Sequence, residues 1–263
     1  MALTQEQKQE IQLLLEKKID NKLKKYARES TSMPFLSRLI QDSEKVAAYS
    51  FIHSIATTLG MSIYEGVSVI IAKNTAKECF RNYGIGGVLS KEQKSVISGI
   101  ITELRNKERK PDINKEIKEV LNSSSDGGTY HKEGNIVDFY MLRDGKEYYF
   151  EIKTVKPNID VFTKSKTKLL EWIARKRKSV KVFLAFPYNP YAPEPYTRFT
   201  IQNMMDYQND FLVGEEYWDF LGGKNTYKDL LSVFDFVGKN YKEKIINKIK
   251  EVAEVKVKEV RNL

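Results

Sequence analysis

Two carboxylates and a lysine are spaced so that they can share one metal ion. A turn at Asp144-Gly145 joins two runs of β-branched and aromatic residues. Asp-Gly between such runs is a strong signal for a β-hairpin with a two-residue loop. In that register Asp138 lies opposite Glu151, and Lys153 shares their face of the hairpin. Opposed carboxylates repel each other unless a cation lies between them, so the pattern predicts a divalent metal site.

The spacing of Glu151 and Lys153 carries little weight by itself. Glu-x-Lys occurs at six other places in the chain, all in highly charged, helix-like segments. Only at Glu151 does it lie on an apparent strand opposite a second carboxylate. The alternative is a surface hairpin in which Lys153 simply neutralises Glu151.

A site of this kind suits the hydrolysis of a phosphodiester. Mg²⁺ favours one or two carboxylates and shares its other positions with water and substrate phosphate. We expect Asp138, Glu151 and the backbone carbonyl of Ile152 to be the metal ligands, with Mn²⁺ able to substitute. Lys153 would position or help to deprotonate the attacking water and offset developing negative charge.

Net charge points to a polyanionic partner. The formal charge is +9, and residues 152–181 carry ten basic and two acidic side chains directly after the predicted metal site. A phosphate backbone is a natural ligand for such a surface, whereas the alternative is a solvated helix face. The candidate DNA-binding residues come from this block, from the segment before the hairpin and, for Arg198, from the chain after the proline-rich loop at 187–196. They are His131, Lys132, Lys156, Asn158, Lys164, Lys166, Lys168 and Arg198.

Glu65 is a further acidic candidate. It lies among apolar residues in a predicted helix that precedes the hairpin, where a carboxylate needs a partner. Either a role at the metal or a buried structural salt bridge would satisfy that need, and the remaining alternative is that Glu65 simply occupies an exposed position of the helix.

Composition excludes several classes of protein. A single cysteine, Cys79, and two histidines exclude an internal disulfide and cysteine- or histidine-rich metal sites. No apolar run is long enough to span a membrane, and the N-terminus lacks the pattern of a signal peptide, so we expect a cytoplasmic protein.

Helical periodicity fills the first 120 residues, and strands follow. We expect helices at 4–26, 34–58, 62–81, 90–104 and 112–121, then the hairpin, a helix at 163–178, a strand at 180–186 and a closing helix at 241–261. A strand, helix, strand path normally gives a parallel pair, so the fold class is α/β (α+β), with a mixed central sheet flanked by helices. We expect a single domain over 1–263, with a helical part at 1–121 and a catalytic part at 130–263.

Asp138 followed by Glu151-Ile152-Lys153 on a hairpin, then a basic helix and a strand, resembles the PD-(D/E)xK nuclease superfamily. Val137 stands where the motif's name has proline. Three further segments, at 60–65, 151–158 and 218–223 with Thr226 and Tyr227, are similar to the TdeIII-type type II restriction endonucleases.

This resemblance implies a restriction-endonuclease-like fold and a homodimer that cuts double-stranded DNA with Mg²⁺. It also implies a short, near-palindromic site, GGNCC for that family, and a cognate DNA methyltransferase in the same organism. The alternatives are a structure-selective nuclease of repair or recombination with the same fold, and a non-catalytic nucleic-acid-binding protein.

Overall fold

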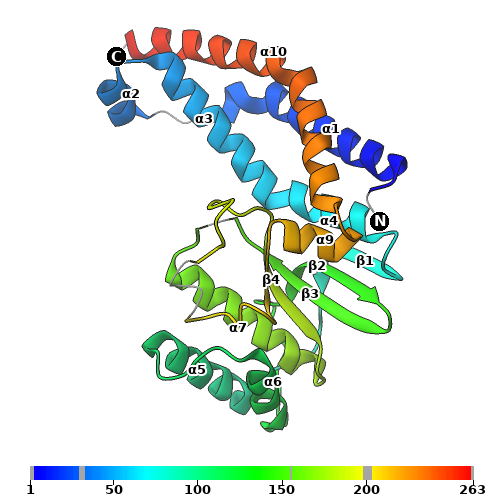
Figure 1. Cartoon of the computed structure of the whole chain (residues 1–263). Coiled ribbons are helices and arrows are strands. Elements are labelled where there is room, and N and C mark those ends of the chain that lie inside the picture. Colours follow the sequence, from blue (N-terminus) through cyan, green and yellow to red (C-terminus); the bar gives the residue numbers. More distant parts are fainter. Residues whose placement is uncertain (1–2, 30–32, 155, 198–202, 262–263) are drawn as a thin grey trace. The chain divides into compact units, whose positions relative to one another are not determined.

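The computed structural model of the chain describes residues 3–29, 33–154, 156–197 and 203–261. They form two compact units (Figure 1). The sheet unit comprises Ser68–Tyr227, and the helical unit combines Leu3–Val67 with the chain from Lys228 onward. Within the described ranges, no helix combines the length and the apolar character that a membrane crossing requires.

A five-stranded mixed sheet forms the centre of the sheet unit. Its strands are adjacent in sequence order, the first two pairings being antiparallel and the last two parallel. The strands are β1 (Glu78–Gly84), β2 (Ile136–Arg143), β3 (Lys146–Ile152), β4 (Lys181–Phe186) and β5 (Phe211–Val213). The prediction of an α+β fold with a mixed sheet is therefore confirmed.

The β2–β3 hairpin has the predicted register. Asp144 and Gly145 have φ angles of 51° and 71°, the left-handed values that a tight two-residue turn demands. Arg143 pairs with Lys146, and the paired residues continue to Phe139 and Phe150.

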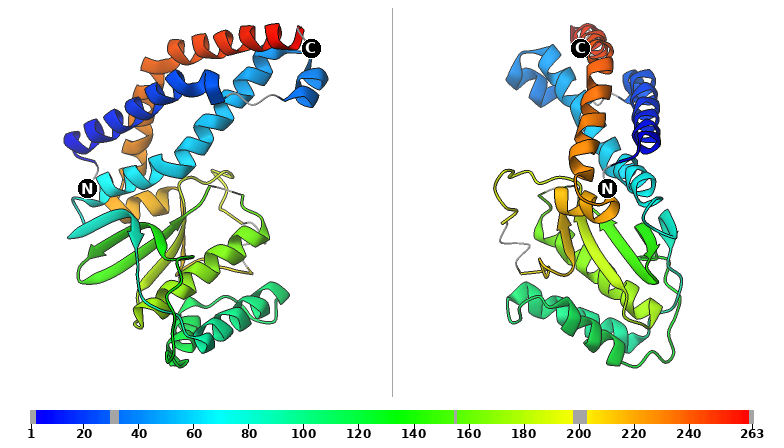
Figure 2. Two further views of the ribbon diagram at one scale, coloured as in Figure 1. Left: turned by 180° about the vertical axis from the view of Figure 1, so that it is seen from behind. Right: turned by 45° about the vertical axis from the view of Figure 1, so that its right-hand side comes forward.

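Helices bury both faces of this sheet. On one face α7 (Ile159–Lys176) packs against β3 and β4, and its Trp172 ring lies 6.4 Å from that of Tyr149. Beyond α7 lie α5 (Lys91–Asn106) and α6 (Ile113–Asn122), as the views in Figures 1 and 2 show. On the other face, Phe220 of α9 (Glu215–Gly222) lies 6.1 Å from Phe150. Strands covered on both faces read as nearly continuous apolar runs, which β4 does.

The helical unit contains α1 (Gln5–Glu29), α2 (Pro34–Ile40), α3 (Ser43–Thr58), the π-helix η1 (Leu59–Ile63) and most of α10 (Thr226–Arg261). The chain passes between the units along α4 (Tyr64–Ala72) and at the start of α10. Tyr26, Phe51 and Val252 are among the residues of its core.

Several predicted helices have different limits. The closing helix expected at 241–261 begins at Thr226, and the helix expected at 163–178 begins at Ile159. The helix expected at 34–58 is interrupted, because Gln41 takes a left-handed conformation and Asp42 caps a new helix by accepting from Lys45 N. Gly60 does not end it, since the chain continues through η1 into α4. The helix expected at 62–81 stops at Ala72, and Glu78 already belongs to β1.

The two units do not follow the predicted division at 121–130. Helices α5 and α6 pack in the sheet unit, although they precede the hairpin, whereas most of α10 joins the N-terminal helices.

Candidate active site

The open end of the hairpin carries the predicted carboxylates. Asp138 and Glu151 come one residue beyond the paired Phe139 and Phe150. Asp138 Oδ2 accepts a hydrogen bond of 2.8 Å from the backbone N–H of Ile152. At the end of the strand pairing, the Asp138 side chain thus accepts a hydrogen bond from the β3 backbone. This hydrogen bond fixes the orientation of the Asp138 carboxylate.

The Lys153 ammonium lies among three oxygen atoms. Its Nζ is 2.5 Å from Glu151 Oε1, 3.7 Å from Asp138 Oδ2 and 3.5 Å from the carbonyl oxygen of Ile152. These are the three groups that the sequence predicts as metal ligands. The strands therefore bring them together around one positively charged atom.

A second lysine, which the hairpin motif does not contain, also reaches the site. Lys168 Nζ donates to Glu151 Oε2 and lies 5.5 Å from the centre of the Trp172 ring. Lys168 comes from the middle of α7, whose N-terminus is capped by Asn158 Oδ1 accepting from Val161 N at 3.0 Å. The sequence predicts Lys168 as a phosphate contact, and its place beside Glu151 was not foreseen.

Burial and charge act together on these groups. Glu151 is only 2% exposed, while the Lys153 side chain is 34% exposed. Burial, followed by the charge of Glu151, raises the pKa of Asp138. Burial by itself would lower the pKa of Lys153, but the Glu151 and Asp138 carboxylates outweigh it and raise that pKa. The site accordingly combines two largely buried carboxylates with two partly exposed ammonium groups at the end of the hairpin.

This donor set fits a hard divalent cation. Asp138, Glu151 and the Ile152 carbonyl supply oxygen only, which is what Mg²⁺ prefers. In the part of the chain that the structure describes, no cluster of three or more His, Cys, Asp or Glu residues suits a metal. The carboxylate pair therefore suits an ion that keeps water and substrate oxygens among its ligands, and does not suit a closed structural site.

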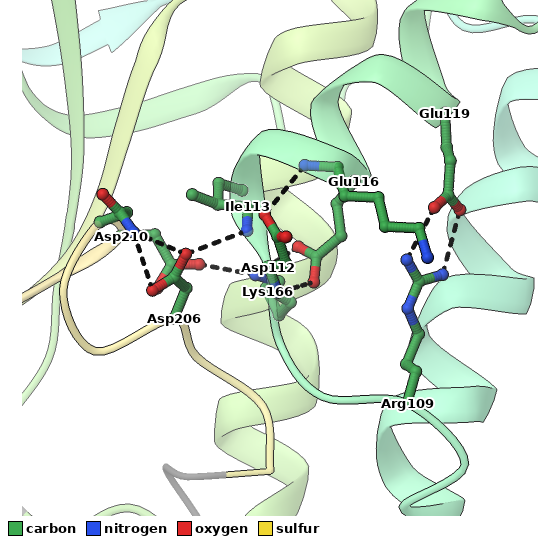
Figure 3. A network of polar contacts seen from close by, with 10 residues as sticks. Arg109, Asp112, Ile113, Glu116, Glu119, Lys166, Asp206 and Asp210 are labelled. Carbon is green, nitrogen blue, oxygen red and sulfur yellow. Dashed lines mark hydrogen bonds and ion pairs between the residues drawn. The ribbon is translucent and has the colours of Figure 1, made fainter.

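The prediction that Lys166 contacts DNA is wrong. Its side chain is fully buried between Glu116 of α6 and Asp210, with N–O distances of 2.6 Å to each (Figure 3). Glu116 Oε1 also accepts from the backbone N–H of Asp112. An ammonium enclosed in this way cannot reach a phosphate, and instead ties α6 and α7 to the segment before β5.

The other DNA-binding candidates lie in varied settings. Lys164 is exposed on α7, and exposed Lys156 lies with its Nζ 4.9 Å from the Tyr191 ring centre. His131 Nε2 is 2.7 Å from Lys94 Nζ, and Lys132 is exposed beside it. For these residues, and for Asn158 with its capping role, DNA contact stays a prediction. Arg198 lies outside the described residues.

Glu65 lies on α4, in the helical unit, and is 8% exposed. Its predicted role at a metal is left as a prediction.

Comparison with known proteins matches the chain to one family. Residues 3–238 fit the profile of the HinfI type II restriction endonucleases. The chain is similar to the type II restriction enzyme MjaII of Methanocaldococcus jannaschii, with 33% identity over 73% of this chain and 55% of that enzyme. It is also similar to the type II restriction enzymes HgiEI and HgiCII of Herpetosiphon aurantiacus. The identities are 30% and 29%, over 84% and 88% of this chain and 82% and 86% of those enzymes.

The chain thus spans about half the length of MjaII and most of the length of the two Herpetosiphon enzymes. No solved structure gave a significant match.

Proposed function

The chain belongs to the HinfI family of type II restriction endonucleases, and on that basis we propose that it hydrolyses phosphodiester bonds of double-stranded DNA at a specific site. The observation that carries the proposal is the set of three oxygen atoms around Lys153 Nζ, from Asp138, Glu151 and Ile152. Two carboxylates held this close need positive charge, and the same oxygens suit a divalent ion.

Each residue then has a distinct task. Asp138, Glu151 and the Ile152 carbonyl would hold Mg²⁺, for which Mn²⁺ could substitute. A bound ion would supply Lewis acidity toward the scissile phosphate and lower the pKa of a coordinated water. Lys153, next to these oxygens, would orient the attacking water and offset the charge that develops on the phosphate. The hydrogen bond from Ile152 N–H would keep Asp138 aimed at the ion.

Digestion of phage DNA with Mg²⁺ tests this proposal directly. The wild type should give discrete bands, whereas Asp138→Ala, Glu151→Ala and Lys153→Ala should give none. Exposed Lys181, at the start of β4, offers a matched control, and its alanine variant should cut like the wild type. Structure-dependent nicking would indicate a repair-type nuclease, and absence of cleavage by the wild type would indicate a silent DNA-binding protein. Unchanged cutting by the three site variants would refute the catalytic assignment.

Assembly and specificity belong to the same proposal. Cutting both strands of a symmetric site calls for two active sites, so we expect a homodimer. The TdeIII-type likeness supports GGNCC as the site, and a cognate methyltransferase would protect the host DNA. Such an enzyme would act in the cytoplasm, where invading DNA arrives. Sequencing the ends of the digested fragments would identify both the site and the cut positions.

A further inference from the structure

Three lysines of α7 lie in three different environments. Lys164 is exposed, Lys166 is fully buried, and the Lys168 side chain is 27% exposed with its ammonium on Glu151. Lys168 is thus the member of this series that is both accessible and joined to a predicted metal ligand. Its ammonium also lies over the ring of Trp172, 5.5 Å from the ring centre.

Charges in the site balance without any ion. Asp138 and Glu151 carry two negative charges, and Lys153 and Lys168 carry two positive ones. Each carboxylate oxygen of Glu151 has its own ammonium, Lys153 at Oε1 and Lys168 at Oε2. Both carboxylates are largely enclosed, so these contacts are only weakly screened by water.

Binding of a divalent cation upsets this balance. Two added positive charges would satisfy the two carboxylates, and the two ammonium groups would lose their partners. Water can solvate the released ammonium groups in the free enzyme, because the Lys153 and Lys168 side chains are 34% and 27% exposed. Bound DNA would displace that water, so each ammonium would then need another acceptor. Phosphate oxygens of the DNA would be such acceptors, in addition to Glu171 on the next turn of α7, whose charge also acts on Lys168.

We propose that Lys168 is a second substrate-contacting lysine, which holds Glu151 Oε2 in the ion-free enzyme and is released to a DNA phosphate when a divalent cation binds. This inference rests on the proposed nuclease function. It makes cation binding and DNA binding reinforce each other through one side chain. The coupling is reciprocal, so DNA should also raise the affinity for the cation.

The test is DNA affinity with and without Ca²⁺, compared between variants. The probe is a labelled duplex that carries the sequence cut by the wild type, at a Ca²⁺ concentration shown by gel to give no cleavage. Ca²⁺ should strengthen wild-type binding. Lys168→Met should bind the ion-free duplex as the wild type does, but should lose about fivefold or more of the gain from Ca²⁺, since one charge-assisted contact is missing.

Two control variants separate this role from others. Lys164→Met should lose affinity equally with and without Ca²⁺, as expected for a lysine that faces solvent throughout. Lys168→Arg keeps the positive charge and should retain most of the gain in DNA affinity from Ca²⁺. This variant still tests the proposal if Lys168→Met fails to fold. Without DNA, Mn²⁺ titration followed by electron paramagnetic resonance should show tighter Mn²⁺ binding by Lys168→Met, because a competing ammonium is gone.

Equal loss in both conditions for Lys168→Met would overturn the proposal and make Lys168 an ordinary phosphate contact. The proposal would also be overturned if Lys168→Met kept both the wild-type gain in DNA affinity from Ca²⁺ and the wild-type affinity for Mn²⁺. Lys168 would then have a purely structural role. If the wild type itself neither cuts DNA nor responds to Ca²⁺, the proposed function fails. If it does both, only the inference about Lys168 is at stake.

Discussion

Replacing Lys166 with methionine should destabilise the sheet unit severely. The ammonium makes two contacts of 2.6 Å, to Glu116 and Asp210, and all three side chains are fully buried. A hydrogen bond to a charged group contributes about 1.5–3 kcal/mol, and removing one partner from a buried ion pair typically costs about 3–5 kcal/mol. We take about 3–5 kcal/mol as the loss in free energy of unfolding for Lys166→Met, because two carboxylates would stay enclosed without their cation.

Urea unfolding followed by tryptophan fluorescence measures this loss. Both tryptophans of the chain, Trp172 and Trp218, are buried in the sheet unit, so their emission reports the unfolding of that unit. At a slope of about 1–3 kcal/mol per molar urea, the midpoint should fall by at least about 1 M. The matched control is Lys164→Met on the same helix, which should stay within about 0.5 kcal/mol of the wild type because its side chain is exposed.

A value for Lys166→Met within about 1 kcal/mol of the wild type would refute the reasoning. It would mean that Glu116 and Asp210 are stabilised by something other than this ammonium. A loss of stability with unchanged DNA affinity of the folded variant would agree with the enclosed position of Lys166.

Three further predictions concern pH, salt and assembly. Burial raises the pKa of Asp210 from 3.8 to about 7, so the folded state holds this proton more tightly than the unfolded state does. Its contribution to stability should therefore fall as pH rises from about 4 to about 7. The urea midpoint of the wild type should decline over that range, and Asp210→Asn should make this decline smaller. An equal decline of the midpoint in both proteins would contradict this prediction. Lys164→Ala should weaken binding to cognate and random duplexes alike and reduce the slope of log K against log salt by about 0.9; an unchanged slope would make Lys164 a solvated residue. Sedimentation should show a dimer, and a monomer both with and without cognate DNA would exclude the proposed assembly.

Local signals in the sequence were sufficient for the hairpin and for several helix starts. Asp144-Gly145 determines the turn, and the turn determines which residues face each other. Capping boxes at Thr4 and Ser90 begin the helices predicted at 4–26 and 90–104, because a side chain and a backbone N–H three residues apart satisfy each other locally. Such features need no knowledge of the rest of the fold.

Strand β1 could not be predicted in the same way. It is an edge strand with mostly exposed residues, so it lacks the alternation of apolar and polar residues that marks a half-buried strand. Strand β5 has only three residues, and its place in the sheet depends on pairing with β4, which is distant in sequence. Long-range pairing decides both cases.

The roles of the α7 lysines could be predicted only in part from the sequence. Residues two apart on a helix point about 200° away from each other, so Lys166 could not share a face with both Lys164 and Lys168. Helical spacing therefore already indicates that Lys166 faces away from Lys164 and Lys168. It held no sign of Glu116 or Asp210, which reach Lys166 from other elements. Likewise, the contact between Lys168 and Glu151 depends on how α7 packs across β3.

The hydrogen bond from Ile152 N–H to Asp138 joins the strand ladder to the chemistry of the site. Many metal sites use a separate residue to aim each ligand, but here the pairing of two strands performs that task. The active site therefore depends on the register that the turn at the opposite end of the hairpin helps to set. A slip of one residue in the pairing of β2 with β3 would send Asp138 and Glu151 to opposite faces of the sheet. An enzyme with every proposed catalytic residue intact could be inactivated in this way, so an intact motif in a relative indicates activity only if the register between its two halves is kept.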